Sequence, residues 1–229
     1  MAIFKSQLLT QASGSVGGIT FSHNAGGNYI RARAIPTDPN SPQQQAVRAV
    51  FGNLAIAWET ALIQSQREAW ETYAANVPIL NALGDQIFIS GLNHYIRSNT
   101  PRVQAGVARI DVAPTVFNLG DFSNPSFAYD SAASEIDTTF TVADDWVNED
   151  GAFAFIYGSR QKNETINFHK GPYRFAGTII GSVGSPETSP SSIAAPFPCA
   201  VGNRCFNRFQ VSRADGRLSL DFRGFGLGA

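Results

Sequence analysis

The stretch from residue 13 to residue 36 limits what this chain can fold into more than any other part of its sequence. Two short segments with alternating side chains, Ile19–Ser22 and Asn28–Ala34, flank a turn-forming run at His23–Gly27. A lone two-stranded hairpin with so little side-chain mass is marginal in water, so it needs further strands from its own chain or from a neighbouring subunit. The N-terminal 40 residues are therefore predicted to form a Gly-rich β arm that serves assembly rather than catalysis.

The composition points to a folded protein with few surface charges. Of 229 residues, 43% are hydrophobic and 15% are charged, which excludes wholesale disorder and suits a surface that neighbours cover. The net charge is −1 and no Lys/Arg block occurs, so direct nucleic-acid binding is not expected. Because the N-terminus carries no continuous apolar run, we expect neither a signal peptide nor a membrane partner, and we expect synthesis in the cytoplasm.

The periodicity changes after a connector with three prolines between residues 36 and 42. Ser41 as N-cap and Gln44 three residues later form a capping-box pattern. Apolar residues then recur at helical spacing, which predicts a helix over 42–63.

Two more helices are predicted in a helical domain over 41–106. Ser65 opens a second capping-box pattern, and this helix is expected to stop at Pro78. Ser90 caps a third helix that is expected to end near 99–101, after a turn and a short strand over 84–89. Most aromatic side chains are buried, so the aromatic residues of these helices are first interpreted as a core.

From about residue 107 the chain alternates with a period of two. Strands are predicted at 138–142, 152–157, 173–180 and 204–213, with turn clusters between them, and a Ser- and Pro-rich surface loop at 184–198. Several short strands with frequent turns are typical of an antiparallel sandwich.

The segment 204–219 resembles the last hairpin of fibronectin type III-like domains. In those domains an alternating aromatic strand leads through an Asp-Gly turn, here Asp215-Gly216, into a final strand. The resemblance implies an immunoglobulin-like β-sandwich over 107–229. The predicted fold class is α+β: a Gly-rich arm, a small helical domain and this sandwich.

Motifs for catalysis or cofactor binding are missing from the sequence. The chain has neither a phosphate-binding loop before a helix nor a nucleophile elbow, and His23, His94 and His169 lack metal-ligand spacing. The carboxylates at 144–145 and 149–150 fit a solvated turn better than a calcium loop. We therefore expect no enzyme activity, no cofactor and no metal.

The two cysteines, Cys199 and Cys205, are separated by five residues. A turn between them would bring them face to face, but a cytosolic origin favours free thiols.

Several segments are similar to uncharacterised proteins of tailed bacteriophages and prophages: 14–20, 26–34, 39–48, 66–70 and 90–102, and more weakly 170–177 and 214–219. The resemblance implies a virion structural component and brings no established catalytic residues.

The function expected from these observations is that of a capsid decoration (cement) protein, located in the virion. Its partners would be the major capsid protein or other virion proteins, and it would form homo-oligomers. The expected interface residues are Ile19, Phe21, Tyr29, Ile30, Arg31 and Arg33 in the arm, with Trp58 and Trp70 as helix anchors.

Two alternatives remain open. One is a tail, neck or baseplate component. The other is a carbohydrate-binding or host-adhesion module that uses Tyr157, Tyr173 and Phe175; a small hydrolase ranks last.

Overall fold

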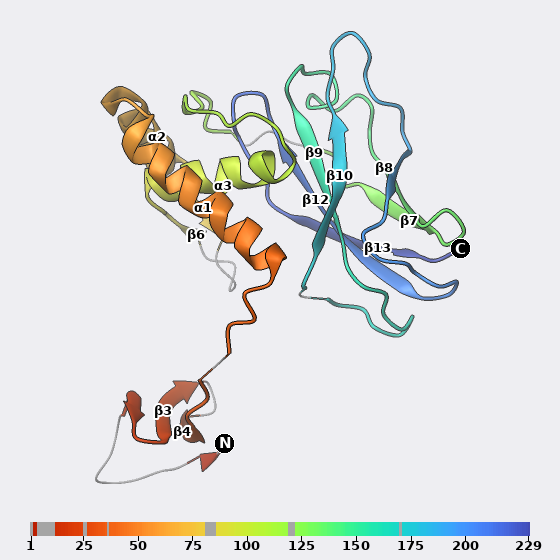
Figure 1. The fold of residues 1–229 in the computed structure, drawn as a ribbon. Coiled ribbons are helices and arrows are strands. Elements are labelled where there is room, and N and C mark those ends of the chain that lie inside the picture. The colour runs from red at the N-terminus through yellow and green to blue at the C-terminus, as the bar shows by residue number, and fades with distance from the viewer. Residues whose placement is uncertain are drawn as a thin grey trace. The chain divides into compact units, whose positions relative to one another are not determined.

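A computed structural model describes residues 2–3, 12–24, 27–35, 37–80, 86–118, 122–169 and 171–229. It divides the chain into two compact units, Met1–Gln44 and Gln45–Ala229 (Figure 1). The predicted boundary at residue 40 lies close to this division. The helical and β segments, which the sequence separates at residue 107, belong to one compact unit. The described residues contain three helices and antiparallel sheets, so the coarse α+β class is confirmed.

The first unit contains four strands rather than the two predicted from the sequence. These strands are β1 (Ala2–Ile3), β2 (Gly14–Val16), β3 (Ile19–Asn24) and β4 (Gly27–Ala32), in the sheet order β1-β4-β3-β2. Gly17, at φ +58°, lies in the two-residue connection between β2 and β3, where a left-handed backbone suits a tight hairpin. Strands β3 and β4 extend into the predicted turn, because Asn24 pairs with Gly27; residues 25 and 26 lie outside the described residues.

The first helix, α1 (Pro42–Thr60), begins where the sequence predicts and ends three residues early. Its capping box is formed: Gln44 Oε1 accepts the Ser41 N–H at 3.1 Å, and Ser41 Oγ accepts the Gln44 N–H at 3.4 Å. These bonds satisfy N–H groups that a helix start otherwise leaves open.

The second helix, α2 (Gln64–Asn76), begins before the predicted cap at Ser65. Gln66 Oε1 accepts the N–H of Ile63 at 3.0 Å, so Ile63 occupies the N-cap position although its side chain has no acceptor. The predicted Ser65 cap is therefore wrong: the box lies two residues earlier, because Gln66 rather than Glu68 occupies the third helical position and bonds back to the N-cap N–H.

The third helix, α3 (Gly91–Gln104), is capped as predicted but runs past the predicted end. Ser90 Oγ accepts the Asn93 N–H at 3.4 Å. Pro101 lies inside the helix, where a proline removes one backbone hydrogen bond. The helix continues because its last turn is fixed by the contacts of Arg102 described below.

The three helices share a hydrophobic core built on aromatic rings. Trp58 and Trp70 each lie 5.6 Å from the ring of Tyr95, centroid to centroid, and all three side chains are buried. Gly91 lets α3 approach α2 closely, since a Cβ atom there would lie 2.7 Å from the backbone nitrogen of Glu71.

A short ladder of β5 (Ile79–Leu80) and β6 (Gln86–Ile87) joins α2 to α3. The strand predicted over 86–89 is therefore confirmed in part, and the turn predicted before it lies outside the described residues.

Two antiparallel sheets make up the rest of the second unit. The smaller has the order β11-β8-β7 and the larger the order β10-β9-β12-β13. Their strands are β7 (Ser126–Asp130), β8 (Glu135–Thr139), β9 (Phe153–Gly158), β10 (Arg174–Ile180), β11 (Ser191–Ala194), β12 (Arg204–Ser212) and β13 (Phe222–Leu227).

Both sheets contribute to one hydrophobic core. Tyr129 and Ile136 from the smaller sheet pack with Ile156 and Phe209 from the larger, and Trp146 joins them from the connection between the sheets. Strand β12 ends before the Asp215-Gly216 turn, and the last strand, β13, begins at Phe222, beyond the segment 204–219 that resembles a fibronectin type III hairpin. Strand β11 lies within the segment predicted to be a loop, because pairing with β8 orders a sequence that has little hydrophobic character of its own.

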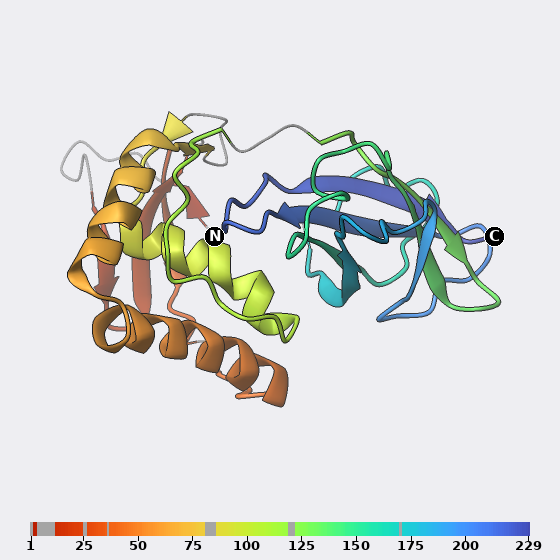
Figure 2. The same ribbon diagram turned by 90° about the horizontal axis from the view of Figure 1, so that it is seen from above.

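Helix α3 is fastened to the larger sheet by two arginines. The Arg102 guanidinium, on a side chain that is 5% exposed, donates from Nε to the Ala108 carbonyl at 3.1 Å and from Nη1 to Ser212 Oγ at 3.1 Å. Arg97 donates from Nη2 to the Ser219 carbonyl at 3.2 Å. Figures 1 and 2 show the helices gathered beside one end of the two sheets, and these bonds explain why both segments form one unit.

The two cysteines form a disulfide, with their Cα atoms 6.4 Å apart. Gly202, at φ +81°, and a hydrogen bond from the Asn203 N–H to the Ala200 carbonyl form the turn that brings them together. Both side chains are buried. The expectation of free thiols is wrong. It rested on a cytosolic origin, whereas the turn at 200–203 places the two sulfur atoms within bonding distance.

Within the described part of the chain, no single helix has the length and apolar character needed to cross a membrane. Helices α1 and α2 pass that test only together, across a 120° bend.

Candidate interaction surfaces

The sheet of the first unit has one apolar face. Strand pairing places Val16 opposite Ile19 and Ile19 opposite Ala32, and it places Phe21 opposite Ile30. Directly opposed residues and residues two apart in one strand point to the same side of a sheet. These five side chains therefore share one face, which we call the apolar face.

The other face of this sheet is polar. Thr20 lies opposite Arg31, and Ser22 opposite Tyr29. Ser15 Oγ and Thr20 Oγ1 are 2.8 Å apart in a hydrogen bond across this face. The predicted interface residues of the arm are thus divided, with Ile19, Phe21 and Ile30 on the apolar face and Tyr29 and Arg31 on the polar face.

Arg33 follows β4, and its N–H donates to the Gly18 carbonyl at 2.8 Å, next to the β2–β3 connection. That bond extends the pairing of the sheet by one step, so this arginine lies at the end of β4 rather than on the body of either face.

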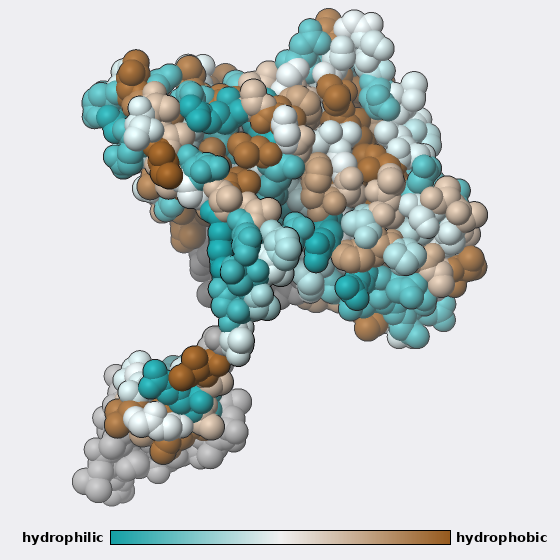
Figure 3. Space-filling view, in the orientation of Figure 1, coloured by the Kyte–Doolittle hydropathy of each residue, from teal (hydrophilic) through white to brown (hydrophobic). Residues whose placement is uncertain are grey.

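None of the described side chains between residues 12 and 41 is buried. On the apolar face, Val16 is 76% exposed and Ile19 is 46% exposed. Figure 3 shows hydrophobic and hydrophilic atoms side by side on the surface of this unit. A sheet needs a covered hydrophobic face for independent stability, so this one gains stability when another surface covers it.

Trp58 and Trp70 lie in the helical core rather than on a surface. Trp70 is fully buried and its Nε1–H donates to the Asp111 carbonyl at 3.1 Å, while Trp58 is 7% exposed. They are not retained as interface residues, because their rings already pack against their own domain.

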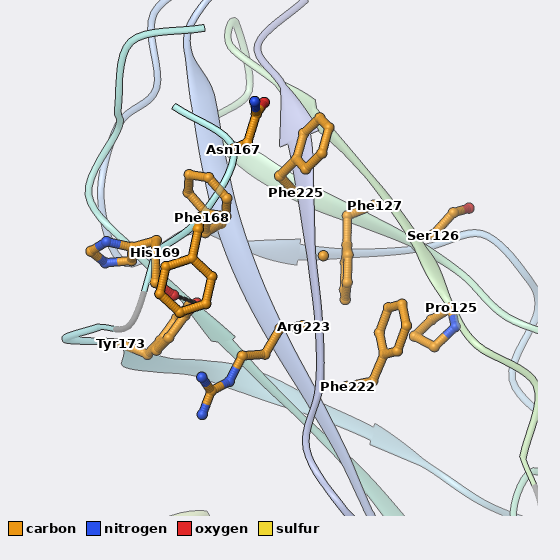
Figure 4. Close-up of a pocket in the computed structure, with 12 residues that line it drawn as sticks. Pro125, Ser126, Phe127, Asn167, Phe168, His169, Tyr173, Phe222, Arg223 and Phe225 are labelled. Carbon is orange, nitrogen blue, oxygen red and sulfur yellow. Dashed lines mark hydrogen bonds between the residues drawn. The ribbon is translucent and has the colours of Figure 1, made fainter. Parts of the chain in front are cut away.

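A groove of about 420 Å³ lies at the β13 edge of the larger sheet, and we call it the aromatic groove (Figure 4). Figure 4 shows Phe168, His169 and Tyr173 on one side of it and Phe127 and Phe222 on the other. The remaining lining residues include Phe206, Arg223, Gly224 and Phe225.

The rings of this groove form a chain of contacts. The ring of His169 lies 5.4 Å from that of Tyr173 and 5.6 Å from that of Phe206, and Phe206 lies 6.0 Å from Phe225. Gly224 lets the Phe127 ring pack directly against the β13 backbone, since a Cβ atom there would lie 2.8 Å from that ring. The rings are thus held in place by one another and by the β13 backbone.

The Tyr173 hydroxyl is protonated and acts as a hydrogen-bond donor. Burial raises its pKa, the neighbouring Arg223 and Arg208 oppose that rise, and Asp221 adds to it. The hydroxyl donates to the His169 carbonyl at 2.8 Å, which links these two lining residues. The tyrosine therefore positions the groove wall and stays neutral at physiological pH.

The described residues do not contain a group of three or more His, Cys, Asp or Glu side chains that would hold a metal ion. The acidic turn pairs with arginine, since Glu149 forms an ion pair with Arg213 and Asp145 lies 3.6 Å from it.

His94 is a core residue rather than a ligand. Its Nε2–H donates to the Val77 carbonyl at 3.0 Å, and Nδ1 has no hydrogen-bond partner among the described residues. Burial and the nearby Arg97 lower its pKa below 6.5, against the effect of the carbonyl bond.

Sequence reasoning named one residue of the aromatic groove, Tyr173, as a candidate for sugar binding. It missed Phe168 and Arg223, which reach the groove from segments 50 residues or more apart along the chain. Of the other two aromatic candidates, Tyr157 is buried beneath Arg208, whose guanidinium carbon lies 3.9 Å from the ring centroid, and Phe175 packs against Tyr157. The alternation of β12 and β13 was the signal available, but only their pairing reveals which rings meet.

Comparison with protein-family models, with curated proteins and with solved structures finds no match to this chain. The functional argument therefore rests on the two surfaces themselves.

Proposed function

We propose that this chain is a non-enzymatic virion structural protein of a tailed bacteriophage or prophage, specifically a capsid decoration protein. The single observation that carries this proposal is a four-stranded sheet with an exposed apolar face and with no buried side chain among those that the structure describes in residues 12–41. The sheet acts as the Gly-rich attachment arm, and neighbouring subunits of the shell cover its apolar face. Repeated attachment at many identical sites gives avidity without a single tight contact.

The second unit is the body that the arm attaches, and we propose that its β part is an immunoglobulin-like sandwich of the fibronectin type III kind. In chain order its seven strands divide so that the first, second and fifth form one sheet and the others form the second sheet. This division, together with the shared core, supports the proposal.

The partners proposed are the major capsid protein or other virion proteins, together with further copies of this chain as a homo-oligomer. Neither nucleic acid nor a membrane enters this proposal, and the chain acts in the virion after synthesis in the host cytoplasm.

The first test is the copy number and location of the chain in purified particles, by quantitative mass spectrometry and a low-resolution reconstruction. Hundreds of copies on the shell support decoration. A dozen or fewer copies at one vertex would reject it in favour of a tail, neck or baseplate component.

A second test compares two substitutions one residue apart. Ile19→Asp places a charge on the apolar face, whereas Thr20→Asp places the same charge on the polar face. Ile19→Asp should remove the protein from particles, and Thr20→Asp should leave it attached. Equal incorporation of both variants would show that the apolar face is not the attachment surface.

A further inference from the structure

The aromatic groove combines ring faces with an excess of positive charge, and the proposed attachment surface does not include it. It lies wholly in the second unit and uses none of the residues of the sheet in the first unit. We propose that this groove binds an acidic oligosaccharide, with a sugar ring against the aromatic side chains and a sugar carboxylate at Arg223.

The aromatic side chains leave a ring-sized apolar surface open to solvent. Phe168 is 70% exposed and Phe225 is 41% exposed, although both line the groove. Exposed aromatic side chains that are gathered in one place mark a binding site more often than scattered ones do. The groove therefore presents an apolar surface that the fold itself does not cover.

Among the described residues that line the groove, Arg223 is the one arginine and none is acidic. Asp221 lies 3.6 Å from Arg208 and 3.7 Å from Arg223, so one carboxylate serves two guanidinium groups. Arg204 stacks on Phe225 at 4.4 Å and donates to the carbonyl of Ile166 at 3.0 Å rather than to a carboxylate. An anionic group at the rim would supply the charge that these arginines lack.

The openness of the groove selects a sugar over an aromatic acid. A small aromatic ligand gains affinity by burying most of its surface in an enclosed pocket. A pyranose ring has one apolar face for the rings and hydroxyl edges that remain in water, which suits a groove whose wall at Phe168 is largely exposed. Asn167 and Ser126 lie on the lining and offer polar groups to those hydroxyls.

The test uses the full chain and isothermal titration with a galacturonic acid hexamer. Its fully methyl-esterified form serves as the neutral control, because it keeps the same rings without the charge. We expect the acidic hexamer to bind and esterification to weaken binding by about tenfold, as for loss of a charge-assisted contact.

Two groove variants and two matched controls test the residues. Phe168→Ala and Arg223→Gln should each weaken binding by about fivefold or more, because each removes a central contact. Phe88→Ala, at a phenylalanine that is 63% exposed on the helical side, and Arg174→Gln, at an exposed arginine of β10, should bind as the wild type does.

Three results would overturn the proposal. The first is no binding of the acidic hexamer at millimolar concentration. The second is equal binding of the esterified hexamer or of the two groove variants. The third is tighter binding of phenylacetate than of the hexamer, which would replace the sugar with an aromatic acid. None of these results bears on attachment through the first unit, because the groove variants leave that unit unchanged.

Discussion

Replacing Arg102 with alanine tests whether the helical and β segments of the second unit depend on each other. The guanidinium makes two hydrogen bonds of 3.1 Å, to Ala108 and Ser212, and two longer ones to the carbonyls of Gly151 and Arg213. Arg102 is 5% exposed and Ser212 is fully buried, so removing the side chain leaves a cavity and takes the donor away from a buried hydroxyl oxygen.

The magnitude follows from the two short bonds. A hydrogen bond from a charged group contributes about 1.5–3 kcal/mol, so the pair gives about 3–6 kcal/mol before opposing effects. Burial lowers the pKa of Arg102, which shows that removing the cation from water opposes these bonds. We therefore expect Arg102→Ala to reduce the free energy of unfolding by about 3 kcal/mol, at the lower end of that range.

The assay is urea unfolding of the full chain, followed by tryptophan fluorescence. Trp58 and Trp70 report on the helical core and Trp146 on the core between the sheets. Arg174→Ala, at an exposed arginine, is the control and should change stability by less than about 0.5 kcal/mol. A loss of less than about 1 kcal/mol for Arg102→Ala would refute the reasoning, because the acceptors at Ala108 and Ser212 would then have found other donors.

Three further predictions concern protonation, packing and the disulfide. The pKa of His94 is lower in the folded state than the ordinary 6.5, so the unfolded chain binds a proton at a higher pH than the folded chain does. The free energy of unfolding should therefore fall as the pH drops below about 6.5. His94→Gln should reduce this pH dependence in urea unfolding measured at several pH values. Gly91→Ala should reduce the free energy of unfolding by about 1–3 kcal/mol, because the added Cβ would meet the backbone of α2. Gly52→Ala is the control: its Cβ would meet no atom, so it should stabilise α1 by about 0.5–1 kcal/mol. Equal shifts of the melting temperature for the two variants would contradict the close approach of α3 to α2. Without reductant, Cys199 and Cys205 should not react with iodoacetamide in intact-mass measurements, and labelling of the unreduced protein would exclude the disulfide. Reduction should lower the free energy of unfolding in urea by about 2 kcal/mol.

Local chemistry in the sequence was enough to locate the three described helices and the strands with clear alternation, whereas β1, β2, β5, β7, β11 and β13 were not predicted. The side chains of Ser41 and Ser90 accept helix N–H groups in the structure, as their positions before apolar periodic segments predict. The alternation in β9 and β12 likewise identified two strands of the larger sheet. These features depend on residues within one turn of helix or one strand, so the sequence contains their cause.

Tertiary contacts decided what local patterns missed. Proline normally ends a helix, yet α3 continues past Pro101 because Arg102 is held by Ser212 at the end of β12 and by nearby backbone carbonyls. Strand β11 lacks a hydrophobic alternation of its own and is ordered by its partner β8. The turn at Gly202 brings together two cysteines that were expected to remain reduced in the cytosol.

The apolar face and the aromatic groove also depend partly on the sequence and partly on the tertiary structure. Alternation in the sequence predicted the strands around Ile19 and Ile30, and the register of their pairing then gathered the apolar side chains on one face. Phe168 and Arg223 come from distant segments, so only the folded chain places them around one groove. The sequence by itself thus determined the helices and the strands with clear alternation, because those choices depend on near neighbours. The tertiary structure alone decided which residues meet, because contacts across tens of residues depend on how all the elements pack.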